Sequence, residues 1–132
     1  MKNDEERARL NATTRAVLGC AFGVSNTLGC GFLEKVYENA LVHELRKAGL
    51  SVAQQVRFVV VYDGAAVGEY VADMVVEGAV LIELKAVKAL DEIHSAQCLN
   101  LLRATNLPVC LLMNFAKPKV DIKRLVGQPR VV

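Results

Sequence analysis

Val80-Leu81-Ile82-Glu83-Leu84-Lys85-Ala86-Val87 is the stretch of this chain that most constrains its fold. It is apolar apart from one acid and one base, and short apolar runs of this kind favour a buried strand. Because side chains alternate across a strand, Glu83 and Lys85 project from the same face, about 6 to 7 Å apart. Asp73 lies ten residues upstream in a second β-prone run, 70–76. An aspartate and a Glu-x-Lys motif on neighbouring strands can form a hard-cation site beside an ammonium group, which points toward phosphodiester hydrolysis.

The hydrophobic periodicity on either side of this strand predicts the remaining elements. We expect an α/β (α+β) fold in which a mixed central sheet is flanked by helices, in the order ααβββαββ. The helices are predicted over 10–27, 32–48 and 91–104, and the strands over 56–62, 67–76, 80–87, 109–115 and 120–126. Gly49 ends the second helix, and Asp63-Gly64 forms a hairpin turn between the first two strands. The order contains no repeat and no linker, so residues 1–132 are expected to form one domain.

The composition describes a compact protein without a membrane segment. Hydrophobic residues make up 53% of the chain, yet no apolar stretch approaches the ~18 residues that a membrane span requires. The N-terminus is highly charged and lacks the apolar core of a signal peptide, so we expect a cytoplasmic protein. The four cysteines form neither a CxxC motif nor a zinc-like spacing, and they lie in or beside apolar segments. Reduced thiols fit the cytoplasm, with a disulfide or zinc role as the minor alternative.

The net charge of +2 gives no global basic field of the kind that attracts nucleic acid. The local basic excess is near the C-terminus, where one acid, Asp121, accompanies Lys117, Lys119, Lys123, Arg124 and Arg130. Such a run is usually a solvated surface. Here it is also compatible with contacts to phosphate groups.

A cation site imposes a requirement on the turn between the second and third strands. A two-residue turn at Glu77-Gly78 would pair Asp73 with Ile82 and leave Asp73 and Glu83 on opposite faces. A three-residue loop over 77–79, or a bulge, brings both acids to one face. The alternative is an ordinary charged hairpin that faces solvent.

Polar residues interrupt the apolar faces of two predicted helices. The apolar stripe of the second helix is predicted to consist of Leu33, Val36, Tyr37, Ala40, Leu41, Leu45 and Ala48. Glu34 lies between Leu41 and Leu45 at the edge of this stripe, where a carboxylate must reach the rim or meet a cation. Glu44, on the same stripe, is about 15 Å from Glu34 along the axis and is interpreted as an ion-pair partner.

On the third helix, Gln97 and Asn100 fall within the predicted apolar face. They are either core amides bonded to backbone or the lining of a polar site. His94 lies near this face and could approach the edge of such a polar site. The alternative is an ordinary surface histidine.

The chain also resembles a known family along most of its length. Gly31-Phe32-Leu33-Glu34-Lys35-Val36-Tyr37 matches the signature of the GxxExxY proteins, which are placed in the PD-(D/E)xK nuclease superfamily. The similarity continues in order through Val71-Ala72-Asp73, Ile82-Glu83-Leu84-Lys85, His94-Ser95-Ala96-Gln97 and Leu111-Leu112-Met113-Asn114-Phe115. The resemblance implies a restriction-endonuclease-like αβββαβ core with a metal at the exposed face of the sheet.

The resemblance also implies roles for individual residues. Asp73 and Glu83 would bind the metal, together with the carbonyl group of Leu84. Lys85 would position the attacking water, and Glu34 would complete the site. Gln97 matches a glutamine found on the third helix in several branches of the superfamily. The chain departs from the pattern at Leu101, where the family often has tyrosine, and at Ala72, in place of a proline.

The implied ligands are oxygen atoms, and these suit Mg²⁺ or Mn²⁺. We therefore expect a metal-dependent nuclease, a phosphodiester hydrolase acting on DNA. One alternative is a non-catalytic module that retains the fold and binds nucleic acid, and another is a homodimeric scaffold. Uptake of Mn²⁺ at the acidic cluster would favour the nuclease over a scaffold.

Overall fold

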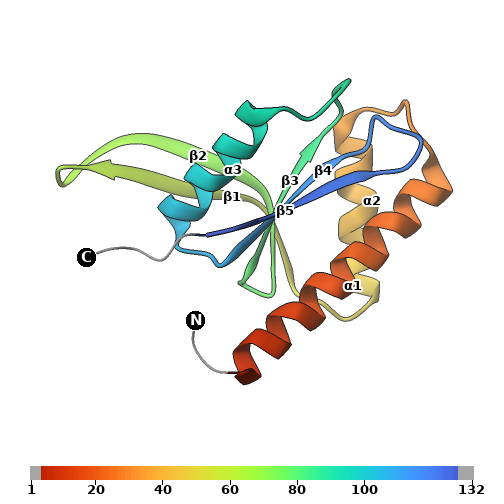
Figure 1. Cartoon of the computed structure of the whole chain (residues 1–132), viewed down its shortest axis with the longest axis horizontal. Coiled ribbons are helices and arrows are strands. Elements are labelled where there is room, and N and C mark those ends of the chain that lie inside the picture. Colours follow the sequence, from red (N-terminus) through yellow and green to blue (C-terminus); the bar gives the residue numbers. More distant parts are fainter. Residues whose placement is uncertain (1–3, 128–132) are drawn as a thin grey trace.

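The structure, a computed structural model, describes residues 4–127 and contains three helices and five strands (Figure 1). The elements follow the predicted order ααβββαββ. The helices are α1 (Asp4–Leu28), α2 (Glu34–Lys47) and α3 (Glu92–Thr105), and the strands are β1 (Val52–Tyr62), β2 (Ala65–Val76), β3 (Val80–Lys85), β4 (Val109–Asn114) and β5 (Asp121–Val126).

The strands form one mixed sheet in the order β1-β2-β3-β4-β5. The pairs β1–β2, β2–β3 and β4–β5 are antiparallel, whereas β3 and β4 are parallel and α3 connects them. A parallel pair needs such a crossover, and the crossover carries α3 onto one face of the sheet. Helices α1 and α2 pack on the other face (Figure 1). The predicted α+β fold is confirmed.

Each face of the sheet has its own hydrophobic core. Met74 and Ile82 face α1 and α2, whereas Leu81 and Cys110 face α3. All four side chains are fully buried. Burial of a large aliphatic side chain contributes about 1.5–3 kcal/mol relative to its exposure, so the two cores hold the helices to the sheet.

Two predicted boundaries are wrong by four residues or more because they followed apolar periodicity alone. Helix α1 begins at Asp4 and not at residue 10, since its first turn is acidic and largely exposed. Acidic side chains are favourable there because they face the positive end of the helix dipole. Strand β1 begins at Val52 and not at residue 56, and this added segment includes Gln54 and Gln55.

The predicted orientation of α3 is also wrong. Gln97 and Asn100 are exposed, and the helix packs on the sheet through Cys98, Leu101 and Leu102. Apolar residues occur on nearly every side of this helix, so a helical wheel could not select the buried side. Contact with the core under α3 determines which side is buried.

The stripe of α2 is likewise rotated from the predicted one. Leu33 is 80% exposed and Val36 is 38% exposed, although both were assigned to the apolar stripe. The buried positions include Tyr37, Leu41 and a carboxylate, Glu38. Helix α2 therefore presents an acid to the sheet beside its apolar residues.

Strands β1 and β2 both change face at one point. Val52 packs against the α1/α2 core, but Val56, which has the same parity, packs under α3. On β2, Met74 belongs to the first core and Ala72 to the second. Between these residues Gln55 has φ 51°, a left-handed conformation that is uncommon for a residue other than glycine. The sheet therefore twists sharply where Gln55 and its neighbours pass β2.

Beyond this twist, the two strands continue as a hairpin that projects from the body of the molecule (Figure 1). The predicted Asp63-Gly64 turn connects them, with both residues at positive φ. We call residues 56–71 the arm.

The sequence also predicted reduced cysteines and the lack of a membrane span, and the described residues can be compared with both expectations. Cys20, Cys30, Cys98 and Cys110 are free thiols, and the last two are buried in the core under α3. Within residues 4–127, no helix combines the length and the apolar character needed to cross a bilayer.

Candidate active site

The β2–β3 connection has the three-residue loop that brings the two acids to one face. Val76 pairs with Val80, so the loop contains Glu77, Gly78 and Ala79. Glu77 and Gly78 both have positive φ, at 54° and 63°. This register places Asp73 opposite Glu83, as the parity argument required.

The regular β2–β3 ladder ends just before these acids, and their side chains replace its hydrogen bonds. The last assigned pair is Met74 with Ile82. At the next position, Glu83 Oε2 accepts from the backbone N–H of Asp73 at 2.8 Å. Asp73 Oδ2 accepts from the backbone N–H of Leu84 at 2.7 Å. The carboxylates therefore lie at a fork between the strands, each bound to the backbone of the opposite strand.

Both carboxyl groups are held more basic than usual. Burial raises the pKa of Glu83 to about 7, and the neighbouring Asp73 charge adds to this effect. Burial also raises the pKa of Asp73, with further contributions from the negative charges of Glu38 and Glu34. Backbone hydrogen bonds and Lys85 oppose both shifts. The site therefore concentrates negative charge with little solvent to stabilise it, an environment that favours a bound cation.

Lys85 follows at the end of β3, on the face that Glu83 occupies. Its positive charge acts on both carboxyl groups. The chain around it is fixed by a buried amide, because Asn114 Nδ2 donates to Val87 O at 2.8 Å and Oδ1 accepts from Val87 N–H at 3.1 Å. The Lys85 carbonyl group accepts from Phe115 N–H at 3.0 Å. These bonds hold the backbone that carries Lys85 beside the acids.

Glu34 reaches the same end of β3 from the first turn of α2. Its Oε2 accepts from the backbone N–H of Ala86 at 3.2 Å, and the residue is exposed. The carboxylate thus leaves the apolar stripe at the rim, and its charge contributes to the raised pKa of both Asp73 and Glu83. Glu44, by contrast, forms the expected ion pair, 2.9 Å from Lys47 Nζ.

The tyrosine three residues after Glu34 explains how α2 is positioned. Tyr37 is fully buried, donates to the carbonyl group of Gly29 at 2.7 Å and accepts from Phe32 N–H at 3.2 Å. Its ring stacks on Phe115, with 4.8 Å between centroids. The loop between α1 and α2 is thereby fixed to the core, and Gly31, at φ 111°, permits its sharp turn. Helix α2 therefore begins where Glu34 can reach β3.

Sequence reasoning missed Glu38, a buried acid of this neighbourhood. Glu38 is 4% exposed and accepts hydrogen bonds from Gln54 Nε2 at 2.8 Å, from Gln55 Nε2 at 3.1 Å and from Lys35 Nζ at 3.2 Å. Its charge acts on Asp73 more strongly than that of Glu34. The available signal was spacing, because Glu38 follows Glu34 by one helical turn and shares the stripe of Leu41.

The donor set fits a hard divalent cation. Asp73, Glu83, Glu34 and the Leu84 carbonyl group offer oxygen only, as Mg²⁺ and Mn²⁺ prefer. Within residues 4–127, Asp73 Oδ1 and Glu83 Oε1 accept no hydrogen bond, so each acid has one oxygen available. In the same part of the chain, no three His, Cys, Asp or Glu side chains converge as a ready metal cluster. Any bound ion would therefore rest on two acids, completed by a carbonyl group, water or a small movement of Glu34.

Gln97 and His94, two of the three polar residues considered on α3, lie in different settings. Gln97 is exposed and makes no hydrogen bond within the described residues, so its role in the site stays a prediction. His94 Nδ1 accepts from Asp91 N–H at 3.1 Å, and Asp91 Oδ1 accepts from the N–H groups of Ile93 and His94. This arrangement is a capping box, which gives His94 a structural role at the start of α3.

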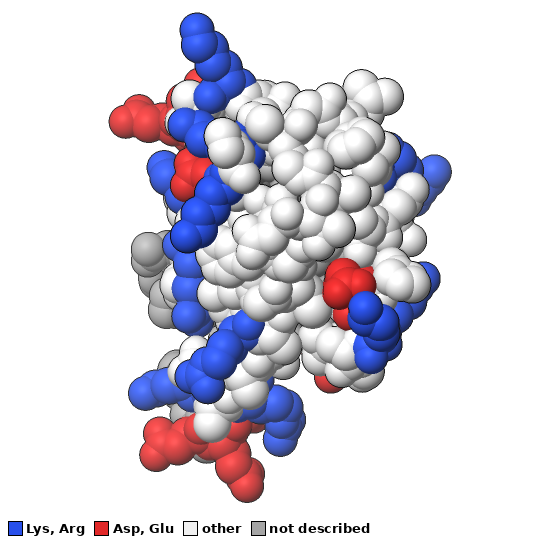
Figure 2. Space-filling view, turned by 90° about the vertical axis from the view of Figure 1, so that its right-hand side faces the viewer, with Lys and Arg blue, Asp and Glu red and all other residues white. Residues whose placement is uncertain are grey.

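The predicted basic residues do not form one cluster. Lys117 and Lys119 lie in the exposed β4–β5 connection, where Lys119 Nζ is 5.7 Å from the ring centroid of Phe22. Lys123 is exposed on β5. Arg130 lies outside the described residues. Figure 2 shows most Lys and Arg along the left margin of the face it presents and others at its right edge, with an uncharged middle between them.

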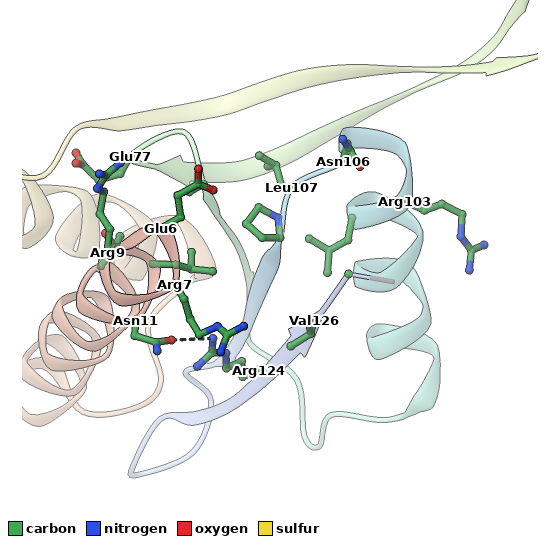
Figure 3. A pocket seen from close by; sticks show the side chains of 16 residues that line it. Glu6, Arg7, Arg9, Asn11, Glu77, Arg103, Asn106, Leu107, Arg124 and Val126 are labelled. Carbon is green, nitrogen blue, oxygen red and sulfur yellow. Dashed lines mark hydrogen bonds between the residues drawn. The ribbon is translucent and has the colours of Figure 1, made fainter. Parts of the chain in front are cut away.

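Arg124 instead lines a pocket of about 810 Å³ between α1, α3 and β5. Its Nη2 lies 3.4 Å from Asn11 Oδ1, and Arg7 and Arg9 line the same pocket (Figure 3). The pocket includes Glu77 and Ala79, which precede β3, so it lies at the opposite end of that strand from Lys85.

Comparisons with known proteins agree with this geometry. No curated protein matches the chain. The crystal structure of SSO0001 resembles it with a TM-score of 0.57 at 13% sequence identity, which shows a shared fold. That match covers 73% of this chain and spans half of the other. The model of a family described as the PD-(D/E)XK nuclease superfamily matches residues 11–125. Since the match includes every strand that carries the acids and Lys85, the chain belongs to the PD-(D/E)XK nuclease superfamily.

Proposed function

We propose that this protein is a metal-dependent nuclease that hydrolyses phosphodiester bonds in DNA, and that it belongs to the GxxExxY group of its superfamily. The observation that carries the proposal is the fork between β2 and β3. There Asp73 and Glu83 face each other with raised pKa values, and Lys85 follows on the same face. Membership of the superfamily supports hydrolysis, whereas fold alone would not.

Mg²⁺ or Mn²⁺ would lower the pKa of a bound water molecule and neutralise negative charge on the phosphate group. Asp73, Glu83 and the Leu84 carbonyl group would hold the ion. Glu34 would contribute directly or through water, since its carboxylate already reaches Ala86 at the end of β3. Each of these groups is an oxygen donor at the same end of the sheet.

Lys85 would orient the attacking water and stabilise negative charge on the phosphate group. An ammonium group is a cation and a hydrogen-bond donor, so electrostatic stabilisation suits it better than general-base work. Gln97 would assist from α3, and Lys117, Lys119, Lys123 and Arg124 would contact phosphate groups. The basic residues are spread over different surfaces, so we assign them only a weak, non-specific contribution.

The proposal is tested by a cleavage panel over duplex, branched and single-stranded DNA and RNA, with Mg²⁺, with Mn²⁺ and with chelator. Glu83→Ala should abolish metal-dependent cleavage while the protein stays folded. Glu92→Ala is the matched control, because Glu92 is an exposed acid in the first turn of α3. We expect it to cleave as the wild type does.

Metal binding separates the nuclease from its alternatives. Titration calorimetry should detect Mn²⁺ binding to the wild type and much weaker binding to Glu83→Ala. Binding of DNA without cleavage under every condition would favour a non-catalytic module. Absence of both Mn²⁺ binding and cleavage would overturn the proposal.

A further inference from the structure

The arm is a large surface that the candidate active site does not use. It is the part of the β1–β2 hairpin beyond the sharp twist, and it projects from the body of the molecule (Figure 1). Its exposed large apolar side chains are between 43% and 74% exposed and comprise Val59, Val61, Tyr62, Val67, Tyr70 and Val71. This concentration on one hairpin is unlike the scattered apolar residues of an ordinary surface.

The outer edge of the arm is an unprotected strand. β1 is the first strand of the sheet and runs for 11 residues, with β2 on one side and, within residues 4–127, no strand on the other. Natural edge strands are usually short, or carry lysine, proline or a bulge that prevents further pairing. From 56 to 62, β1 contains neither lysine nor proline. The irregularity near Val60 places the extra residue, Val67, on β2, so β1 stays regular beyond Gln55, from Val56 to Tyr62.

The charges of the arm argue against nucleic acid as its partner. Arg57 is its one basic residue, and its Nη1 lies 3.3 Å from Glu69 Oε1. Asp63 and Glu69 give the arm a net negative charge. A β-ribbon that binds the DNA backbone needs an excess of positive charge. The chemistry of the arm therefore suits a protein partner with an apolar strand.

We propose that the arm binds a second copy of this chain, through antiparallel pairing of the two β1 edges about a two-fold axis at Val60. In this register Arg57 lies opposite the partner's Asp63, the first residue of the hairpin turn, and the same pair forms twice. Val59 lies opposite the partner's Val61 on the face of β1 that carries Arg57. Phe58 lies opposite the partner's Tyr62 on the other face. One strand is thus complementary to itself in charge and in shape, as a two-fold interface requires.

The available area is consistent with this occupant. Val59, Val61 and Tyr62 are the three that lie on the pairing strand β1, and they present roughly 300 Å² of apolar surface per copy, or about 600 Å² for a pair, which is the size of a weak interface. Backbone hydrogen bonds between the two β1 strands would add to the burial. A weak dimer is therefore expected, with its dissociation visible on dilution.

Sedimentation velocity over a wide range of protein concentrations tests the dimer directly. The wild type should pass from dimer to monomer on dilution. Val61→Lys should raise the dissociation constant of the dimer by at least about tenfold, because it places a charge in the centre of the pairing. Ile93→Lys is the matched control, since Val61 and Ile93 are both 62% exposed and Ile93 lies on α3. A monomeric wild type, or equal effects of the two variants, would overturn the proposal.

Charge exchange tests the register. Arg57→Asp and Asp63→Arg should each be monomeric alone, because each places like charges opposite one another twice. Mixed together they should form a heterodimer, since both pairs then join opposite charges. Thermal melts of each variant check the fold, because Asp63 has a left-handed backbone that arginine adopts less readily. Failure of two folded variants to associate on mixing would reject this register. The proposal does not depend on nuclease activity, so it stands or falls separately from the proposed function.

Discussion

Gln55 of β1 lies opposite Asp73 of β2, as the register of their neighbours shows. The left-handed backbone of Gln55 lets the side chains of Gln54 and Gln55 reach the same carboxylate, that of Glu38. Adjacent residues of a regular strand point to opposite faces. Here Gln54 and Gln55 both donate to Glu38. The buried acid on α2 therefore holds the twist in β1 beside which Asp73 is placed. We interpret Glu38 as a positioning residue for the candidate site.

Removal of this acid should cost stability as well as activity. Glu38→Ala leaves the amides of Gln54 and Gln55 without their acceptor in a partly buried setting, so we expect a loss of about 2–3 kcal/mol in the free energy of unfolding. Glu44→Ala is the control, because Glu44 is a partly exposed acid of the same helix paired with Lys47. It should cost less than about 1 kcal/mol. Urea denaturation measures both, and equal losses would contradict the role of Glu38.

Glu38→Ala should also weaken Mn²⁺ binding beyond any effect of lower stability, measured at a temperature where the variant is fully folded. The reason is that relaxation of the twist moves Asp73 relative to Glu83. Glu38→Gln keeps the shape and one acceptor oxygen, and it should recover most of the metal affinity. A folded Glu38→Ala protein with wild-type Mn²⁺ affinity would limit Glu38 to stability alone.

The pKa of Glu83 predicts an unusual pH dependence for the metal-free protein. The pKa rises from 4.5 to about 7 on folding, so the folded protein binds more protons than the unfolded chain between these values. The contribution of Glu83 to stability is therefore greatest below about pH 4.5 and falls as pH rises to about 7, by an amount on the order of 3 kcal/mol. Asp73, whose pKa is also raised, changes stability in the same direction.

Denaturation in the presence of chelator, at about pH 5 and about pH 8, measures this effect. Glu83→Gln should be more stable than the wild type at the higher pH, and its stability should change less between the two. Its side-chain oxygen can still accept the hydrogen bond from Asp73 N–H. A wild type that is equally stable at both pH values, after correction for its histidines, would show that Glu83 titrates normally.

Strand periodicity predicted the geometry of the two acids conditionally, because the sequence left open whether a two-residue turn, a three-residue loop or a bulge connects β2 and β3. Once Gly78 allows a three-residue loop, parity alone brings Asp73 to the face of Glu83. Glu34 was predictable for a related reason, since a carboxylate at the edge of an apolar stripe must find the rim or a partner. In both cases one local rule decided the outcome.

The remaining features of the site and the fold depended on tertiary packing, which no local sequence rule specifies. Glutamine gives no sign of a left-handed conformation, so the twist at Gln55 and the burial of Glu38 were not foreseen. The orientation of α3 was wrong for a similar reason, because Cys98 and Gln97 lie on competing sides of a helix that is apolar nearly all round. Contact with the hydrophobic core beneath each helix determined which side of that helix is buried.

Tyr37→Phe should separate the positioning of α2 from general packing. The change keeps the stacked ring but removes the hydroxyl group that binds Gly29 O and Phe32 N–H. We expect a loss of about 1–3 kcal/mol in the free energy of unfolding, because both bonds are partly buried. Amide hydrogen exchange should increase in the α1–α2 loop more than in the sheet. Uniform exchange across the molecule would show that the hydroxyl group does not fix this loop.

Glu34→Gln tests whether the first acid of α2 belongs to the site. The substitution keeps the oxygen that accepts from Ala86 N–H and removes the charge that reaches Asp73 and Glu83. Because Glu34 is exposed, stability should change by less than about 0.5 kcal/mol. If Glu34 helps to hold the ion or its water, Mn²⁺ affinity and cleavage should both fall. Glu92→Gln serves as the control for loss of an exposed acid. Calorimetric titration of Mn²⁺ into both variants gives the answer, and wild-type affinity in Glu34→Gln would remove Glu34 from the metal site.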